Sequence, residues 1–547
     1  MIPASTGMTV IQCDMFKRHR VFWVALCIFA LLLAKNPFST RTLIPNFEPY
    51  PDTIHYVNSA QSFIRGHGLQ IWREGRALKT TVPPLYSLAL VPAFLLRNDA
   101  RMFYFINILL AFGSFSFFYL LLRRLITNNF SLITAVSLFL YVTNYFIYWY
   151  PSLAMAENLT LFLFMIGIYL FTIPVSKKNV VIAALTTVAF YVTKYASMPL
   201  MIIYFLAYGL KIILRKDIAS LMLLVTISAS TFLIYSFWEW SAKGSTLLTT
   251  IVGFFFSSGN AHVASSDSWF SLSYLPAHLP KYLRAMAGGY SVRFLWDQTP
   301  IVPVFVGTPG LLGLFLGMFS KRFRLLFVTL FSLLFSSILF MSTFYSFDMR
   351  YLNFAIPALL IGFAVCWDNI HIVMLNLSFN TLRRLTSISL LLIFVFYFVT
   401  NAIRLKKQVM LNLKYAETPW YYVSVVKLNK YFSALPKKNR KPVVISSLIP
   451  YYIDFFSNNT YDMLPLSLEQ EFRNNRGAAW GSNNFSDLLV LYESYIRKGY
   501  DVYVHNYGLG NEKKLQNDHN AIHTYFKTIL VSTGCYGACN IWRVTLR

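Results

Sequence analysis

The chain has 547 residues, of which 56% are hydrophobic and only 13% are charged, and its mean hydropathy is +0.51. Because soluble domains usually carry about 25% charged residues, this composition excludes an ordinary soluble globular protein and favours a protein embedded in a lipid bilayer. The formal net charge of +26 does not indicate a nucleic-acid partner, since the basic residues form no single dense patch.

The basic residues occur instead in short clusters between apolar runs. These clusters are Lys17-Arg18-His19-Arg20, Arg123-Arg124, Lys177-Lys178, Arg215-Lys216, Lys321-Arg322-Phe323-Arg324 and Arg383-Arg384. Short cytoplasmic loops carry such clusters under the positive-inside rule. The pattern therefore predicts an α-helical polytopic membrane protein, which we assign to a bacterial inner membrane with its N-terminus in the cytoplasm.

The apolar stretch 21–35 follows the first basic cluster, and no small-x-small cleavage site follows it, so it predicts an uncleaved signal anchor. Ten further apolar stretches of nearly spanning length predict about eleven transmembrane helices in all. They lie at 102–122, 130–149, 157–174, 180–194, 197–214, 218–238, 301–319, 325–343, 351–367 and 385–403.

Two long segments between these spans, 36–100 and 239–300, are predicted to be outer loops of a transmembrane domain covering 1–403. The apolar piece 85–96 is too short to cross a bilayer, which needs about 20 residues. We interpret it as a helix that lies in the interface or against the bundle. Treating it as a span would also move Arg123-Arg124 to the outer side, against the charge rule.

The composition becomes mixed after the last span, and 404–547 is predicted to be a small extracytoplasmic α/β domain. Apolar segments 442–448 and 501–505 resemble buried strands, and 486–498 resembles an amphipathic helix. Cys535 and Cys539 lie close together near the C-terminus. In an oxidising compartment they could form a disulfide, and two unpaired thiols are the equal alternative.

Asp52 and Tyr56 lie four residues apart in the first outer loop, so they share one face of a predicted helix over 53–65. A carboxylate there can take a proton from an acceptor hydroxyl. It can equally cap the helix N-terminus. The same loop carries basic residues, Lys79 among them, which can bind an anionic lipid phosphate or remain solvated loop charge.

Three further ionisable residues lie at predicted outer span ends, where such residues are costly and usually functional. Glu157 opens a span, where it can contact a metal or substrate, or complement the positive helix N-terminus. Lys194 can bind phosphate or extend toward the interface. Arg350 can clamp a phosphate with its planar fork or pair with Asp348. All of these residues are expected to converge on one membrane face.

The chain resembles the GT-C superfamily of membrane glycosyltransferases, in the branch that contains protein O-mannosyltransferases and aminoarabinose transferases of lipid A. The resemblance covers the whole length in outline. The residues that carry it are Asp52 and Tyr56, Ser59-Ala60, Gly66-His67-Gly68, Pro83-Pro84-Leu85-Tyr86, Ala156-Glu157-Asn158, Arg350-Tyr351-Leu352 and Pro357. Two positions depart from the branch: Thr53 follows Asp52 where many relatives have Glu, and Val82 stands where aminoarabinose transferases carry Lys.

The resemblance implies an inverting enzyme that transfers a sugar from a polyprenyl-phosphate carrier to a lipid, glycan or protein acceptor on the outer face. Asp52 would be the general base, and Glu157, with Asp52, would bind an optional divalent metal ion. The implied substrate- and phosphate-binding residues are Tyr56, Lys79, Tyr86, Lys194, Arg350 and Tyr351.

Three other functions compete with this one. A secondary transporter or lipid-linked sugar flippase often shows internal repeats and broken mid-membrane helices. The sequence shows no repeat, and its acids cluster at one membrane face and not at mid-span. An O-antigen ligase or polymerase has its large outer loop late in the bundle, whereas this chain has a long first loop and a tail domain. A non-enzymatic scaffold would not need converging acids and bases.

Overall fold

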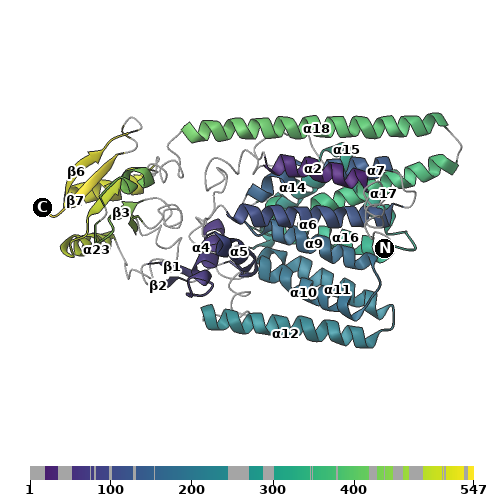
Figure 1. Ribbon diagram of the computed structural model, residues 1–547, viewed down its shortest axis with the longest axis horizontal. Helices are drawn as coiled ribbons and strands as arrows, with labels where there is room; N and C mark the ends of the chain where they lie inside the picture. Colours follow the sequence, from purple (N-terminus) through teal and green to yellow (C-terminus); the bar gives the residue numbers. More distant parts are fainter. Residues whose placement is uncertain are drawn as a thin grey trace, which may run out of the picture.

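The computed structural model describes residues 19–34, 52–73, 76–78, 82–97, 102–126, 131–152, 154–243, 270–287, 301–344, 347, 349–376, 380–417, 428–436, 438–446, 460–466, 485–507, 509, 513–534, 537 and 540–547. Within these residues, long helices form one bundle and a small α/β domain lies beyond one end of it (Figure 1). We call the bundle end nearest this domain the domain-side end, and the opposite end the far end.

Each predicted span coincides with helical structure, and 130–149 is divided in two at Thr143–Asn144. The bundle helices are α2 (Arg20–Ala34), α6 (Met102–Leu125), α7 (Ser131–Val142), α8 (Tyr145–Trp149), α9 (Glu157–Thr172), α10 (Lys177–Thr193), α11 (Met198–Ile213), α12 (Ile218–Lys243), α15 (Val304–Gly317), α16 (Arg324–Ser342), α17 (Ala355–Asn376) and α18 (Asn380–Glu417). Helix α14 (Leu275–Ala287) comes from the second predicted outer loop.

The lengths and hydropathies of these helices identify a membrane protein. Among the described residues, five helices are long and apolar enough to cross a membrane, and further apolar helices of 10–17 residues accompany them. The five are Met102–Leu125, Tyr195–Ile213, Ile218–Ser241, Arg324–Ser342 and Ala355–Val373. The total of about eleven crossings stays a prediction.

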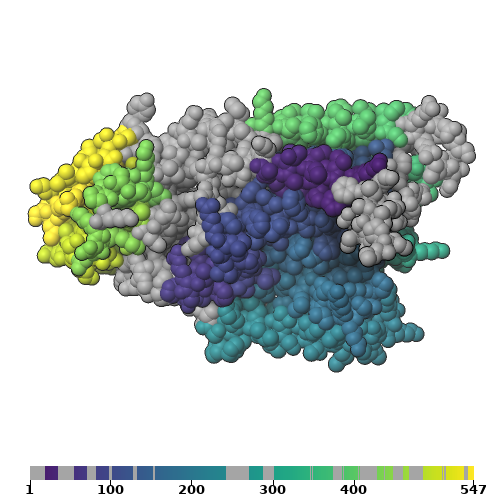
Figure 2. Space-filling model, viewed as in Figure 1, coloured from purple at the N-terminus to yellow at the C-terminus, as the bar shows by residue number. Residues whose placement is uncertain are grey.

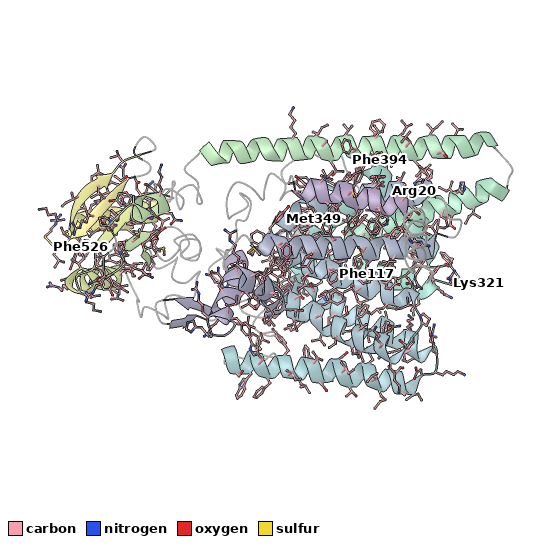
Figure 3. The ribbon with its side chains drawn as sticks, in the orientation of Figure 1. Arg20, Phe117, Lys321, Met349, Phe394 and Phe526 are labelled. Carbon is pink, nitrogen blue, oxygen red and sulfur yellow. The ribbon has the colours of Figure 1, made fainter. Side chains whose placement is uncertain are left out.

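Helices α12 and α18 lie on opposite edges of the bundle (Figures 1 and 2). Both expose large apolar side chains, such as Phe237 on α12 and Phe396 on α18, which are 68% and 62% exposed. Lipid is the solvent in which such surfaces are stable. Arg20 and Lys321 lie at the far end (Figure 3), as basic cytoplasmic clusters would, although the orientation in the membrane stays a prediction.

Two helices continue past the predicted span ends. Helix α18 has 38 residues and does not stop at 403 but reaches Glu417. At 1.5 Å per residue it is about 57 Å long, well beyond the ~30 Å hydrocarbon core of a bilayer. Helix α12 likewise reaches Lys243, so Glu239 belongs to a helix and not to the loop predicted for 239–300.

Asn144 explains the break between α7 and α8. Its Oδ1 accepts hydrogen bonds from the backbone N–H groups of Phe146 and Ile147, which caps α8. Its Nδ2 donates to the Ile301 carbonyl at 3.1 Å and to the Tyr397 hydroxyl at 2.6 Å. A single buried amide therefore starts the short helix that leads toward Glu157 and ties it to two later segments of the chain.

The first outer loop contributes helix α4 (Asp52–Ile64), the hairpin strands β1 (Ile71–Arg73) and β2 (Arg76–Leu78), and helix α5 (Leu85–Leu96). Gly66, at φ +80°, ends α4 in the left-handed conformation that glycine adopts without strain. The predicted short helix 85–96 is α5, which is too short to span a bilayer and lies near the domain-side end (Figure 1).

The C-terminal domain is a five-stranded sheet in the order β4-β3-β5-β7-β6, with β3 parallel to both β4 and β5. Its elements are β3 (Val443–Ser446), β4 (Asp462–Pro465), α23 (Phe485–Arg497), β5 (Val502–His505), α24 (Lys513–Tyr525), β6 (Lys527–Ser532) and β7 (Ile541–Thr545). The predicted strands at 442–448 and 501–505 and the helix at 486–498 correspond to β3, β5 and α23. Cys535 and Cys539 lie outside the described residues.

Histidines are buried in this domain. His505 Nδ1 accepts the Tyr507 N–H at 3.0 Å, so the proton of the neutral ring lies on Nε2, which faces the Ser446 hydroxyl at 2.6 Å. Burial, with a smaller contribution from His519, lowers the pKa of His505 to about 3. Burial and neighbouring His523 lower the pKa of His519 to about 4. Both rings are therefore held neutral by the fold.

Acidification from pH 7 to pH 5 is expected to destabilise this domain. His505 titrates near its ordinary pKa of 6.5 when unfolded and near 3 when folded, so between these values the unfolded state binds more protons. Stability therefore falls as the pH drops below about 6.5, and His505 alone contributes on the order of 2 kcal/mol at pH 5.

Hydrogen exchange of the β3 and β5 amides in the full-length protein, corrected for intrinsic rates, measures this loss. His505→Gln replaces the imidazole with an amide that can both donate and accept hydrogen bonds but does not titrate. It should reduce stability at pH 7 and weaken the dependence on pH. An equal acid-induced loss in wild type and variant would contradict the assignment.

Candidate active site

Glu157 and Lys194 form a buried ion pair at the domain-side end of the bundle. Glu157 is the first residue of α9 and is 2% exposed, and Lys194 directly follows α10 as its C-cap. The Lys194 ammonium donates to Glu157 Oε1. Within the described part of the chain, Glu157 Oε2 has no hydrogen-bond partner. One carboxylate oxygen is therefore used for the pair, while the other remains available to a ligand.

Tyr351 and Arg350 complete this cluster from the 3-10 turn η4 (Met349–Leu352). The Lys194 nitrogen lies 4.3 Å from the centre of the Tyr351 ring, and Arg350 Cζ lies 6.0 Å from it. Arg350 is 5% exposed and donates to the Met155 sulfur at 3.1 Å. Cations near an aromatic face are attracted by the ring quadrupole, most strongly where water is excluded. Two cations are thus gathered around one ring.

Hydrogen bonds hold helix α9 at both ends, and the one at the domain-side end reaches Glu157 itself. At the domain-side end, Asn353 Nδ2 donates to the Glu157 carbonyl at 2.5 Å. At the far end, Arg124 donates to the Thr172 carbonyl at 2.9 Å, and Lys211 donates to the Leu170 and Ile173 carbonyls at 2.6 and 2.7 Å. Cations at the C-terminus and an anion at the N-terminus both complement the helix dipole.

A second buried acid, Glu239, contacts Tyr195, the residue that directly follows Lys194. Glu239 of α12 is 0% exposed, and the Tyr195 hydroxyl donates to its Oε1 at 2.7 Å. Tyr235, one turn earlier on α12, lies 3.3 Å from the Tyr195 hydroxyl. The sequence interpretation missed Glu239, since it assigned that position to a loop. The signal that would have found it is a carboxylate within an apolar helix.

Of the other predicted site residues, two pack against each other, and the rest are described only in part or not at all. Asp52 is the first residue of α4, and only its backbone is described. Tyr56 and Tyr86 are buried at 3% and 0% exposure, with their rings edge to face 5.0 Å apart, so they pack against each other. Lys79 lies outside the described residues, as does Asp348. The structure therefore brings together Glu157, Lys194, Arg350 and Tyr351.

The described residues contain no group of three or more His, Cys, Asp or Glu side chains that could hold a metal ion. In the cluster around Tyr351, Glu157 offers one carboxylate oxygen, Oε2, that has no hydrogen-bond partner among the described residues. A metal shared by Asp52 and Glu157 therefore stays a prediction, and no step below depends on it.

Comparison with known proteins identifies the fold. No protein-family model and no curated protein matches the sequence. ArnT from Cupriavidus metallidurans bound to undecaprenyl phosphate matches the structure with a TM-score of 0.61 and 12% identity, over 99% of this chain and 98% of ArnT. Its apo state gives the same values. The archaeal oligosaccharyltransferase AglB from Archaeoglobus fulgidus gives a TM-score of 0.49 at 12% identity, over 94% of this chain and 73% of AglB.

The likeness to ArnT extends over almost the whole chain and confirms the predicted resemblance to the GT-C superfamily at the level of the fold. The protein is thus a membrane protein that shares its fold with ArnT over almost its whole length. ArnT is an aminoarabinose transferase.

Proposed function

We propose that the protein is a glycosyltransferase that moves a sugar from a polyprenyl-phosphate carrier to a hydroxyl of a lipid, glycan or protein acceptor. The observation that carries this proposal is the gathering of Lys194 and Arg350 around Tyr351, beside buried Glu157. Cations fixed in a water-poor site stabilise an anion far better than cations in water. The undecaprenyl phosphate bound to ArnT supports a polyprenyl-phosphate donor.

In the proposed reaction, Asp52 takes the proton of the acceptor hydroxyl as that oxygen forms a bond to the anomeric carbon. The bond from this carbon to the carrier phosphate breaks, and the phosphate leaves with the electron pair. Attack opposite the leaving group inverts the anomeric configuration. Lys194 and Arg350 stabilise the charge that develops on the phosphate, and Glu157 holds Lys194 in place.

The proposed location is a bacterial inner membrane, with the N-terminus in the cytoplasm and the C-terminal domain outside. Helix α4 lies at the domain-side end of the bundle (Figure 1), and Met349, which directly precedes Arg350, lies toward the same end (Figure 3), so transfer would occur at the outer face. The far end, where Arg20 and Lys321 lie (Figure 3), would face the cytoplasm.

Transfer assays in reconstituted vesicles test the function. Wild-type protein supplied with radiolabelled polyprenyl-phosphate sugars should label an acceptor, and Asp52→Asn should lower kcat by about 10²–10⁴-fold, the usual loss on removing a general base. Asp217→Asn is the matched control: Asp217 caps α12 by accepting the Ser220 N–H at 3.0 Å, and asparagine caps equally well.

One result would contradict the proposed function, and another would contradict the role of Asp52 alone. Label that crosses the bilayer without being transferred would establish a flippase. Equal transfer by wild type and Asp52→Asn would retain the enzyme class and remove Asp52 from its mechanism.

A further inference from the structure

A chain of buried contacts connects the first outer loop to the segment that precedes Glu157. Tyr56 of α4 packs edge to face against Tyr86 of α5, at 5.0 Å and 87°. The Tyr86 hydroxyl donates to Oδ1 of Asn107 on α6 at 2.8 Å. Asn107 Nδ2 donates in turn to the Pro151 carbonyl at 3.1 Å. Asn107 and Tyr86 are both 0% exposed.

The same contacts continue to the start of α9. Pro151 belongs to the 3-10 turn η1 (Tyr150–Ser152), just before Glu157. Asn158 is 4% exposed and its Nδ2 donates to the Tyr150 carbonyl at 2.8 Å. Two neighbouring carbonyls of this turn are therefore held by two buried amides, one from α6 and one from α9.

Physical chemistry makes this arrangement rigid. A buried backbone carbonyl in a turn needs a donor, because leaving it unsatisfied away from water costs about 1–3 kcal/mol. Asn107 lies in one of the longest apolar helices, where a polar side chain is costly unless both of its groups are used. Both are used here, one toward α5 and the other toward η1.

We propose that Asn107 is a positioning residue for the transfer reaction. It holds helix α4, which carries Asp52, in register with helix α9, which carries Glu157. It acts on α4 through the Tyr86 and Tyr56 rings, and on α9 through the Pro151 carbonyl. This inference rests on the proposed function, in which Asp52 serves the acceptor and Glu157 orients the cation that serves the donor phosphate.

A positioning role differs from simple structural support in what it predicts. A residue that only stabilises the fold lowers the amount of folded enzyme and leaves kcat per folded molecule unchanged. A residue that keeps the two sides of the site in register lowers kcat and leaves KM for the donor nearly unchanged, since neither Lys194 nor Arg350 loses a contact.

Three variants and a control test the proposal in reconstituted full-length protein. The variants are Tyr86→Phe, which removes only the hydroxyl that donates to Asn107, Asn107→Leu, and the double variant. The control is Tyr208→Phe. Tyr208 is 0% exposed like Tyr86, but its hydroxyl has no hydrogen-bond partner among the described residues, and it lies on α11 in the same helical turn as Lys211.

The expected result is a kcat about 10-fold lower for Tyr86→Phe and about 100-fold lower for Asn107→Leu, the scale of a misplacement near 1 Å. KM should stay within about threefold of wild type. Because Tyr86 acts through Asn107, the double variant should be no slower than Asn107→Leu. Hydrogen exchange of amides 154–160 should accelerate in all three variants and not in Tyr208→Phe.

Wild-type kcat in Tyr86→Phe, or losses that multiply in the double variant, would overturn the proposal. Failure of the proposed function gives a different result, namely no sugar transfer by wild type. In that case the exchange measurement still decides the coupling: unchanged exchange at 154–160 in Asn107→Leu overturns it, whereas faster exchange retains the mechanical link between α5 and α9.

Discussion

Lys194→Met should reduce sugar transfer by about 10²–10³-fold and destabilise the folded protein by about 3–5 kcal/mol. The first effect follows from removing a cation from the proposed phosphate site. The second follows because Glu157, which is 2% exposed, would remain as a buried charge without its ion partner. Measuring kcat and the melting temperature of the same purified preparation separates the two effects.

The double variant Glu157→Gln, Lys194→Met separates the effect of an unpaired buried charge on stability from the effect of the missing cation on transfer. Since it removes both charges together, it should regain much of the stability that Lys194→Met loses, and it should not regain transfer. Recovery of transfer with stability would show that Lys194 serves only the fold.

Lys211→Met is the matched control, because Lys211 is also a buried lysine, 8% exposed. Its partners are the carbonyls of Leu170 and Ile173 at the opposite end of α9. Its loss should cost about 1–3 kcal/mol and leave transfer per folded molecule unchanged. A loss of transfer as large as that in Lys194→Met would contradict a local role for Lys194.

The helices of the bundle were predictable because lipid leaves the backbone few alternatives. Away from water, every N–H and C=O group needs an internal partner, so a long apolar stretch is a helix almost by necessity. Hydropathy says nothing about where a helix ends once it leaves lipid. This is why α18 extends to Glu417, beyond the predicted limit at 403, and why α12 includes Glu239.

The site was predictable as a set of residues and not as a set of contacts. Glu157, Lys194, Arg350 and Tyr351 all stood out as polar residues at span ends. That Lys194 pairs with Glu157, and that both cations flank Tyr351, depends on how α9, α10 and η4 pack. No spacing in the sequence encodes that packing.

Asn107 was missed for a different reason. A lone amide in an apolar helix gives little signal, and one of its partners is a backbone carbonyl, which every residue possesses. Only the folded chain shows that its two polar groups connect α5 to the turn before α9. Sequence patterns reveal charged site residues more readily than the neutral residues that hold them.

A second large loss of stability and transfer is expected when a side chain is added between helices α15 and α17, because the backbones of these helices touch. A Cβ added at Gly313 of α15 would overlap the Gly362 carbonyl of α17, and one added at Gly310 would lie 2.6 Å from the Leu359 carbonyl. A side chain can rotate away from such an overlap, but a backbone carbonyl cannot. Small residues at a membrane-helix interface permit this approach, which dispersion between the backbones then stabilises.

Gly313→Val should therefore separate the two helices and cost more than about 3 kcal/mol, above the usual range for overpacking. Helix α17 starts at Ala355, two residues after Asn353, which holds the Glu157 carbonyl. Displacing α17 would move Arg350 and Asn353 as well, so transfer per folded molecule should also fall. Size-exclusion profiles and melting temperatures measure the first loss, and the vesicle assay measures the second.

Gly209→Ala is the control for this prediction, since among the described residues a Cβ at Gly209 of α11 would meet only Leu221 at 3.8 Å and Leu224 at 3.9 Å, which is ordinary contact. Alanine is also the better helix former by about 1 kcal/mol, so the variant should be neutral or more stable. Equal damage from both variants would mean that any added methyl disturbs the bundle. Damage from Gly313→Val alone would show that the α15–α17 contact keeps the η4 turn, and with it Arg350, against Glu157 and Lys194.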